Sequence, residues 1–250
     1  MTIKTDAPHW SLWSIDQRIA ATTLPTEPSR PRGEWRGLWE LSETVGSKKR
    51  KQILGHLEIH HIPQGNKVLL EISHKVPGVQ GMSVSSEISL TCKSNDWLRP
   101  ESWVSETISH SGRSDMANTR SSQTGRVSRS DLQIKSLDET LYPLPKRVDL
   151  TSSFSLLAAL PRLHSRESER LEFATIEELM ILRTEQILER IHAVELATAA
   201  GPVSLQGYRH YGRGTPPVHY WLGPRGLPLF IASLGSALLA LEFEDLGEAP

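Results

Sequence analysis

The residues best placed to do chemistry lie in one short run, His56–His60, which alternates polar and apolar side chains. In a β-strand, side chains two positions apart point to the same face, about 6.6–6.8 Å from one another. His56, Glu58 and His60 would therefore form a row of two imidazoles and a carboxylate, which could ligate a metal ion or act as an acid–base pair. Glu71 is expected to join the row from a neighbouring strand. The alternative is a solvent-facing polar surface with no chemical task.

Tryptophan is unusually frequent, with seven Trp against four Phe. A Trp side chain offers a large apolar surface and one N–H group, which suits either the rim of a ligand cavity or a hydrophobic core. Trp39 and Trp221 are candidates for both roles. Trp10 and Trp13 lie among few other apolar residues, so we expect them to clamp over an open barrel mouth or to dock on a partner.

Motifs for nucleophilic catalysis and for nucleotide binding are missing from the sequence. Gly81–Ser85 resembles GxSxG but lacks the final glycine, and no SxxK, GxGxxG or P-loop pattern occurs. Cys92 is the single cysteine, so neither an intramolecular disulfide nor a cysteine-based zinc site is available. Its place beside Ile88 and Leu90 predicts a buried structural thiol. We predict no cofactor and no bound metal.

The charges of the 250-residue chain nearly balance, because 28 basic residues stand against 29 acidic ones, a net charge of −1. Nucleic-acid binders and polybasic membrane-surface proteins need an excess of Lys and Arg, so neither class is indicated. The most apolar window, Leu229–Phe243, is shorter than the roughly 18–20 residues that cross a bilayer. It predicts a buried hairpin and no membrane insertion. The first residues show no leader pattern, so we expect a cytoplasmic protein.

These candidate residues must be positioned by strands. Residues 1–33 are expected to be an N-terminal arm and proline-rich linker, and residues 34–250 a single antiparallel β-rich domain. From 34 to 135 the apolar residues recur every second position, as in half-buried strands. One hairpin turns at Gln64-Gly65 or at Gly65-Asn66, and both choices keep the polar row on one face. The serine-rich stretch 105–131 is expected to form exposed edge strands or a mobile loop.

The second half of the chain holds one predicted helix and one ambiguous segment. Residues 152–163 are expected to form a short helix capped by Thr151 or Ser152 and limited by Pro161. Residues 165–199 fit either a helix or a strand, and their periodicity favours the helix. After residue 203, four short apolar runs separated by Gly and Pro clusters predict a closing antiparallel meander.

The segment Tyr208–Gly212, followed by Val218–Leu229, resembles the hairpin that closes the LolA-like half-barrels, including the DUF3108-type proteins. The resemblance implies an incomplete antiparallel barrel around a short helix, with much of 165–199 in strands. The sequence departs from the pattern at Gly223, where an acidic turn residue is usual. A cytoplasmic enzyme of violacein biosynthesis also uses this half-barrel, so the fold by itself does not decide the function.

Together these observations predict a mainly β protein, in which a curved antiparallel sheet forms an incomplete barrel around a short helix. We expect it to hold an apolar or amphipathic small molecule in the half-barrel cavity. The alternatives are a cytoplasmic biosynthetic enzyme that uses the cavity for acid–base chemistry, and an interaction module that offers residues 105–131 for strand addition. The candidate ligand-binding residues are His56, Glu58, His60, Glu71, Trp39 and Trp221. The face of 56–60 that points inward distinguishes the first two hypotheses.

Overall fold

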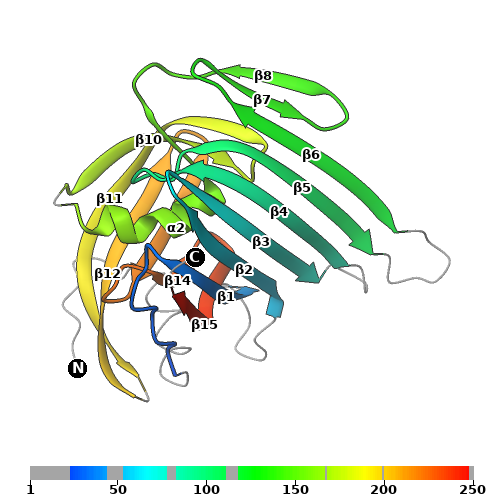
Figure 1. Cartoon of the computed structure of the whole chain (residues 1–250). Coiled ribbons are helices and arrows are strands. Elements are labelled where there is room, and N and C mark those ends of the chain that lie inside the picture. Colours follow the sequence, from blue (N-terminus) through cyan, green and yellow to red (C-terminus); the bar gives the residue numbers. More distant parts are fainter. Residues whose placement is uncertain are drawn as a thin grey trace.

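The structure is a computed structural model that describes residues 23–43, 53–77, 83–110, 118–166, 168–198 and 200–247. These residues form one 15-stranded sheet and one helix, α2 (Ser153–His164). The sheet curves around the helix, which lies on its concave side (Figure 1). The strands in chain order are β1 (Glu34–Glu43), β2 (Ile53–Gln64), β3 (Lys67–Pro77), β4 (Ser83–Lys93), β5 (Pro100–His110), β6 (Thr119–Val127), β7 (Asp131–Lys135), β8 (Glu139–Pro143), β9 (Asp149–Ser152), β10 (Arg170–Glu177), β11 (Ile181–Thr198), β12 (Gly201–Gly212), β13 (Thr215–Leu222), β14 (Pro228–Ala232) and β15 (Ser236–Gly247).

The sheet is open. Its strand order is β8-β7-β6-β5-β4-β3-β2-β1-β15-β14-β13-β12-β11-β10-β9, so within the described chain β8 and β9 are two edges that do not pair with each other. All neighbouring strands are antiparallel except β9 and β10, which run parallel. The pairing of β1 with β15 joins the two halves of the sheet. The predicted fold is confirmed: an incomplete, mainly antiparallel barrel surrounds a short helix.

The β2–β3 hairpin turns at Gly65-Asn66, because Gln64 pairs with Lys67. Gly65 has a φ of 63°, a left-handed conformation that glycine adopts without strain and that two-residue hairpin loops require. Alternation along β2 then buries Leu57 and Ile59, which are 4% and 0% exposed. These two side chains face α2, so the polar residues between them point to the outer, convex face of the sheet.

Helix α2 begins at a reciprocal cap. Ser152 Oγ accepts a hydrogen bond from the N–H of Ser155 at 3.0 Å, and Ser155 Oγ accepts one from the N–H of Ser152 at 2.8 Å. The helix runs through Pro161 and ends at His164, one residue beyond the predicted end at 163. Within the described residues, no helix is long and apolar enough to cross a membrane.

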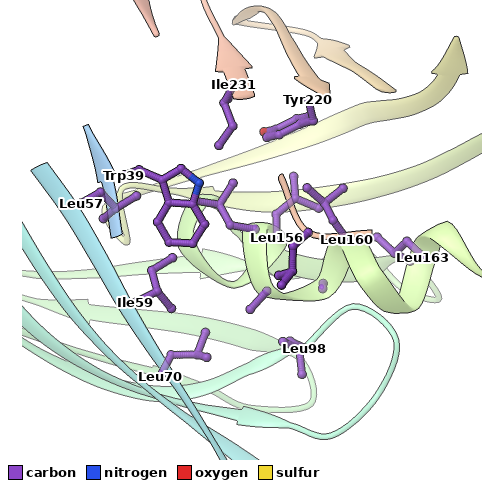
Figure 2. Packing of buried hydrophobic residues seen from close by; sticks show 14 of the residues in the cluster. Trp39, Leu57, Ile59, Leu70, Leu98, Leu156, Leu160, Leu163, Tyr220 and Ile231 are labelled. Carbon is purple, nitrogen blue, oxygen red and sulfur yellow. The ribbon is translucent and has the colours of Figure 1, made fainter. Parts of the chain in front are cut away.

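The concave side of the sheet is filled by α2. All residues from Ser155 to Leu163 are buried. Figure 2 shows side chains of the helix packed among side chains of the sheet, and the labelled ones are Trp39, Leu57, Ile59, Leu70, Leu98, Leu156, Leu160, Leu163, Tyr220 and Ile231. None of the cavities described below is lined by a residue of α2. The helix therefore occupies the space in which the sequence predicted the ligand.

The ambiguous segment 165–199 is mainly strand, so its helical periodicity was misleading. It contains β10 and the 18-residue β11, which pairs with β10 on one side and with β12 on the other. A register shift in β11 between Ile191 and Val194 explains the pattern: Ile191 stands opposite Gly207, and Val194 stands opposite Leu205. One face of β11 therefore carries odd-numbered residues before the shift and even-numbered residues after it. Apolar residues on that face do not recur at every second position along the whole strand, which hides the strand pattern in the sequence.

Of the serine-rich stretch 105–131, the described residues 105–110 and 118–131 include part of β5 and the whole of β6, and the first half of β6 has no strand partner on one side. β5 and β6 pair along most of their length, and β6 pairs with β7 from Thr124 to Val127. The shorter strands β7 and β8 then extend the sheet to its edge. The expected edge-strand interaction surface is therefore reduced to the first half of β6.

Candidate functional site

Three of the predicted residues, Glu58, His60 and Glu71, come together on the outer face of the sheet. His60 Nε2 lies 3.0 Å from Glu34 Oε1, and His60 Nδ1 lies 3.4 Å from Glu71 Oε2. Glu58 forms an ion pair with Arg36 at 3.3 Å. The sequence therefore predicted this grouping correctly, but its partners on β1 were missed because no local spacing links them.

The same residues line an open outer groove of about 610 Å³. Cross-strand pairing places Glu58, Ser73, Glu87 and Glu106 in one row over four strands. Ser73 Oγ donates to Glu87 at 2.9 Å, and Arg120 pairs with Glu106. Among the described residues, no group of three or more His, Cys, Asp or Glu side chains is arranged to hold a metal ion. An acid–base role for this row stays a prediction.

His56 lies apart from that group. It is exposed and lines a separate groove of about 360 Å³, with Gly55, Lys75, Val84 and His110. The wall of this groove is more apolar than that of the outer groove, and its residues lie toward one end of strands β2 to β5. The predicted row of two imidazoles is thus divided between two surface depressions.

The two tryptophans named as ligand-binding candidates are core residues. Trp39 is 0% exposed, donates its Nε1–H to the carbonyl of Pro228 at 2.8 Å and meets the Phe243 ring edge-on at 5.4 Å. Trp221 is also 0% exposed and stands opposite Gly207, where the absence of a side chain leaves room for its ring. Both rings therefore stabilise the sheet. Trp10 and Trp13 lie outside the described residues.

A second candidate site lies at the seam, which we define as the gap between the edge strands β8 and β9 together with the connection 144–148 that crosses it. Side chains close this seam where strand pairing does not. Gln123 Nε2 donates to the carbonyl of Leu179 at 2.7 Å, and Tyr142 Oη donates to the carbonyl of Met180 at 3.5 Å. The β10–β11 turn is thereby fastened to β6 and β8 above the helix (Figure 1).

The seam contains a cavity of about 690 Å³, the seam cavity. Its floor is apolar: Leu150 of β9 and Ala174 of β10 are 3% and 1% exposed. Leu144 and Val148, both half-buried, belong to the wall that the crossing connection provides. Small-molecule sites commonly have volumes of about 300–1,000 Å³ and mainly apolar walls. The seam cavity therefore has the size and the floor expected for a ligand of moderate size.

The rim of the seam cavity is basic. Arg99, Arg129, Lys146 and Arg147 line it, and Asp131 is the one carboxylate among the residues that line it. The outer groove has the opposite character, with four carboxylates beside one arginine and one histidine. The near-neutral charge of the whole chain thus conceals two surfaces of opposite sign.

The comparisons with known proteins support the fold and leave the function open. Neither a protein-family model nor a curated protein matches this chain. Among solved structures, a β-barrel-like protein of domain of unknown function DUF1849 from Brucella abortus superposes with a TM-score of 0.56 at 6% identity, covering 85% of this chain and 98% of that one. A DUF1089 family protein from Pseudomonas aeruginosa gives a TM-score of 0.41 at 12% identity over 74% of this chain and 92% of that one. The first of these similarities supports a barrel-like fold.

A third polar group, inside the barrel, was not predicted. His61 is fully buried, stacks on Trp35 at 5.4 Å and donates its Nδ1–H to the carbonyl of Gly33 at 2.7 Å. The pKa of His61 is lowered to about 4, chiefly by burial and to a smaller extent by the positive charge of Arg162, while the hydrogen bond to Gly33 opposes the shift. Arg162 is 8% exposed and contacts Ser94 Oγ at 3.4 Å. Neither His61 nor Arg162 lines the seam cavity or the outer groove.

Cys92 lies in the same interior region, and the prediction of a buried thiol is confirmed. The side chain is 0% exposed, and burial raises the pKa of its thiol well above the usual range. A thiol that resists ionisation is a poor nucleophile, because the thiolate is the reactive form. Cys92 therefore contributes packing to the core.

The basic residues of the seam cavity were missed by sequence reasoning because they share no motif. Arg99 precedes β5, Arg129 lies in the β6–β7 turn, and Lys146 and Arg147 lie in the β8–β9 connection. Only the open sheet brings them together. One signal was available: Pro143–Arg147 is a proline-flanked basic stretch without periodicity, which is typical of a loop that can carry a binding site.

Proposed function

We propose that this protein binds an apolar or amphipathic small molecule in the seam cavity. The observation that supports the proposal best is the volume of the cavity, about 690 Å³, together with the half-buried apolar side chains of Leu144 and Val148 that line it. We now place the ligand in the seam cavity and no longer in the half-barrel interior, because α2 fills the interior. The resemblance of the C-terminal hairpin to LolA-like half-barrels is consistent with ligand binding, and the barrel-like structural neighbour supports the fold that the proposal needs.

The orientation of β2 favours binding over catalysis by the His–Glu row. Leu57 and Ile59 point toward the helix, whereas Glu58 and His60 lie on the outer face. Acid–base chemistry on a ligand held in the seam cavity would need titratable groups in that cavity. The residues that line it offer a single carboxylate, Asp131, which accepts a hydrogen bond from Ser130 Oγ at 2.6 Å.

The test is calorimetric titration of the purified protein with decanol and with decanoate, paired with a variant that fills the cavity. Val148→Trp places an indole in the cavity wall, and we expect it to abolish saturable binding. Val104→Trp is the matched control, because Val104 is 49% exposed on the outer groove. Unfolding temperatures of both variants show whether the fold is retained. Saturable binding with a negative heat-capacity change in the wild type supports the proposal. Absence of binding by both probes contradicts it, as does binding that Val148→Trp leaves intact.

A further inference from the structure

The basic residues of the seam cavity differ from most other basic side chains of the sheet in having no acidic partner. Arg36, Arg183 and Arg209, for example, each form an ion pair with a glutamate. Within the described chain, no ion pair within 4.0 Å is formed by Arg99, Arg129, Lys146 or Arg147. Like charges around one cavity repel each other, and the repulsion falls when an anion binds among them.

These cations approach the cavity from two sides. Arg99 donates from its guanidinium to the carbonyl of Ser128 at 3.2 Å, which holds it against the β6–β7 turn beside Arg129. Lys146 and Arg147 come from the connection that crosses the seam. Arg147 has a φ of 60°, a left-handed backbone conformation that is rare for a residue with a side chain. The charges therefore converge on the rim and leave the apolar floor free.

The separation of a basic rim from an apolar floor indicates which kind of ligand fits. An anionic head placed at the rim would meet guanidinium groups, which bind carboxylates and phosphates through paired N–H donors. An alkyl or similar apolar body attached to it would pack mainly on Leu144 and Val148, the half-buried apolar side chains that line the cavity. A neutral amphiphile would gain only the apolar contacts, and a free anion would gain only the contacts with the guanidinium groups.

We infer that the seam cavity selects amphipathic ligands with an anionic headgroup, a carboxylate or a phosphate monoester, bound by Arg99, Arg129, Lys146 and Arg147. The inference rests on the proposed function and narrows it to one chemical class. The two possible headgroups share their chemistry, so the experiment includes both, together with inorganic phosphate as a probe of the head without the apolar body.

The experiment compares the dissociation constants of decanol, decanoate, decyl phosphate and inorganic phosphate for the full chain by calorimetry. We expect decanoate and decyl phosphate to bind at least about tenfold more tightly than decanol, and the advantage to shrink as salt is raised. The double variant Arg129→Gln/Arg147→Gln is expected to weaken both anionic amphiphiles by about tenfold or more relative to its effect on decanol. Its matched control is Arg120→Gln/Arg213→Gln, which removes the same charge from exposed positions outside the cavity.

The possible outcomes distinguish the proposed binding of a small molecule from the inferred preference for an anionic headgroup. Equal binding of decanol and decanoate overturns the inference and leaves the proposed function standing. Equal loss in the seam and control variants overturns it as well, because the effect would then come from net charge. Binding of inorganic phosphate without binding of any decyl compound contradicts the proposed function while retaining anion recognition. Lack of binding by every probe overturns both.

Discussion

Stability should fall steeply in mild acid because two histidines are buried in the neutral form. Burial lowers the pKa of His61 and of His210 from 6.5 to about 4. His210 is 5% exposed, and its Nε2 lies 3.1 Å from Gln186 Oε1. In the unfolded chain both residues take up a proton near pH 6.5, whereas in the folded protein they do so only near pH 4. The unfolded state binds more protons across this window, so stability decreases as the pH falls through it.

The size of the effect follows from the two pKa values. At about pH 5, proton binding by the unfolded state costs the folded state about 2 kcal/mol for each histidine, relative to neutral pH. Two histidines together give about 4 kcal/mol, which is a large part of the roughly 5–15 kcal/mol by which folded domains are stable. Below about pH 4 the loss levels off, because the folded protein then takes up the same protons.

The assay is urea denaturation of wild type and His210→Gln at neutral pH and at about pH 5. Glutamine stays neutral at both pH values and can hydrogen-bond to Gln186. We expect the drop in unfolding free energy between the two pH values to be about 2 kcal/mol smaller in the variant than in the wild type. His56→Gln removes an exposed histidine and is the control, expected to keep the wild-type drop. An identical drop in His210→Gln and wild type would refute the reasoning.

Three further substitutions test contacts that hold the fold. Glu27→Ala should lower the unfolding free energy by about 2 kcal/mol in urea titrations, because the Glu27 carboxylate accepts two backbone N–H groups of the β13–β14 turn and its loss leaves the buried N–H of Leu227 unpaired. Gly125→Ala should lower the melting temperature clearly, because the new Cβ would overlap the buried Trp103 ring; an unchanged melting temperature would contradict the packing. Ser152→Ala should cost about 1 kcal/mol through loss of its bond to the N–H of Ser155, and a neutral result would show that the cap is dispensable.

The local pattern of the sequence was sufficient for most of the strands and for the helix. Alternation in β2 and β3 identified the correct polar and apolar faces, because each strand there has one wet side. The cap at Ser152 and the apolar run after it predicted α2. The prediction for segment 165–199 failed because the register shift beside Ile191 interrupts the alternation of apolar and polar residues. No local signal in the sequence reveals a shift that depends on the partner strand.

The candidate site was harder to predict than the fold. The His60–Glu71 contact was found because it lies between adjacent strands of one hairpin. Residues of the seam cavity run from Arg99 to Ala174 in the sequence, and they meet only because the sheet stops short of closing. Openness of a barrel depends on curvature and strand number, which the spacing of apolar residues does not encode. The ligand was predicted in the half-barrel interior, where the structure places the buried residues Ser155 to Leu163 of α2.

The central claim is that an anionic amphiphile occupies the seam cavity, and photochemical labelling tests it most directly. A decanoate analogue that carries a diazirine on its chain is bound to the full protein, irradiated and located by peptide mass spectrometry. The account predicts labelling of residues 143–150 and of the peptide around Ala174, suppressed by excess decanoate and absent in Val148→Trp. Labelling of the outer-groove strands β2 to β5, or labelling that excess decanoate does not suppress, would contradict it.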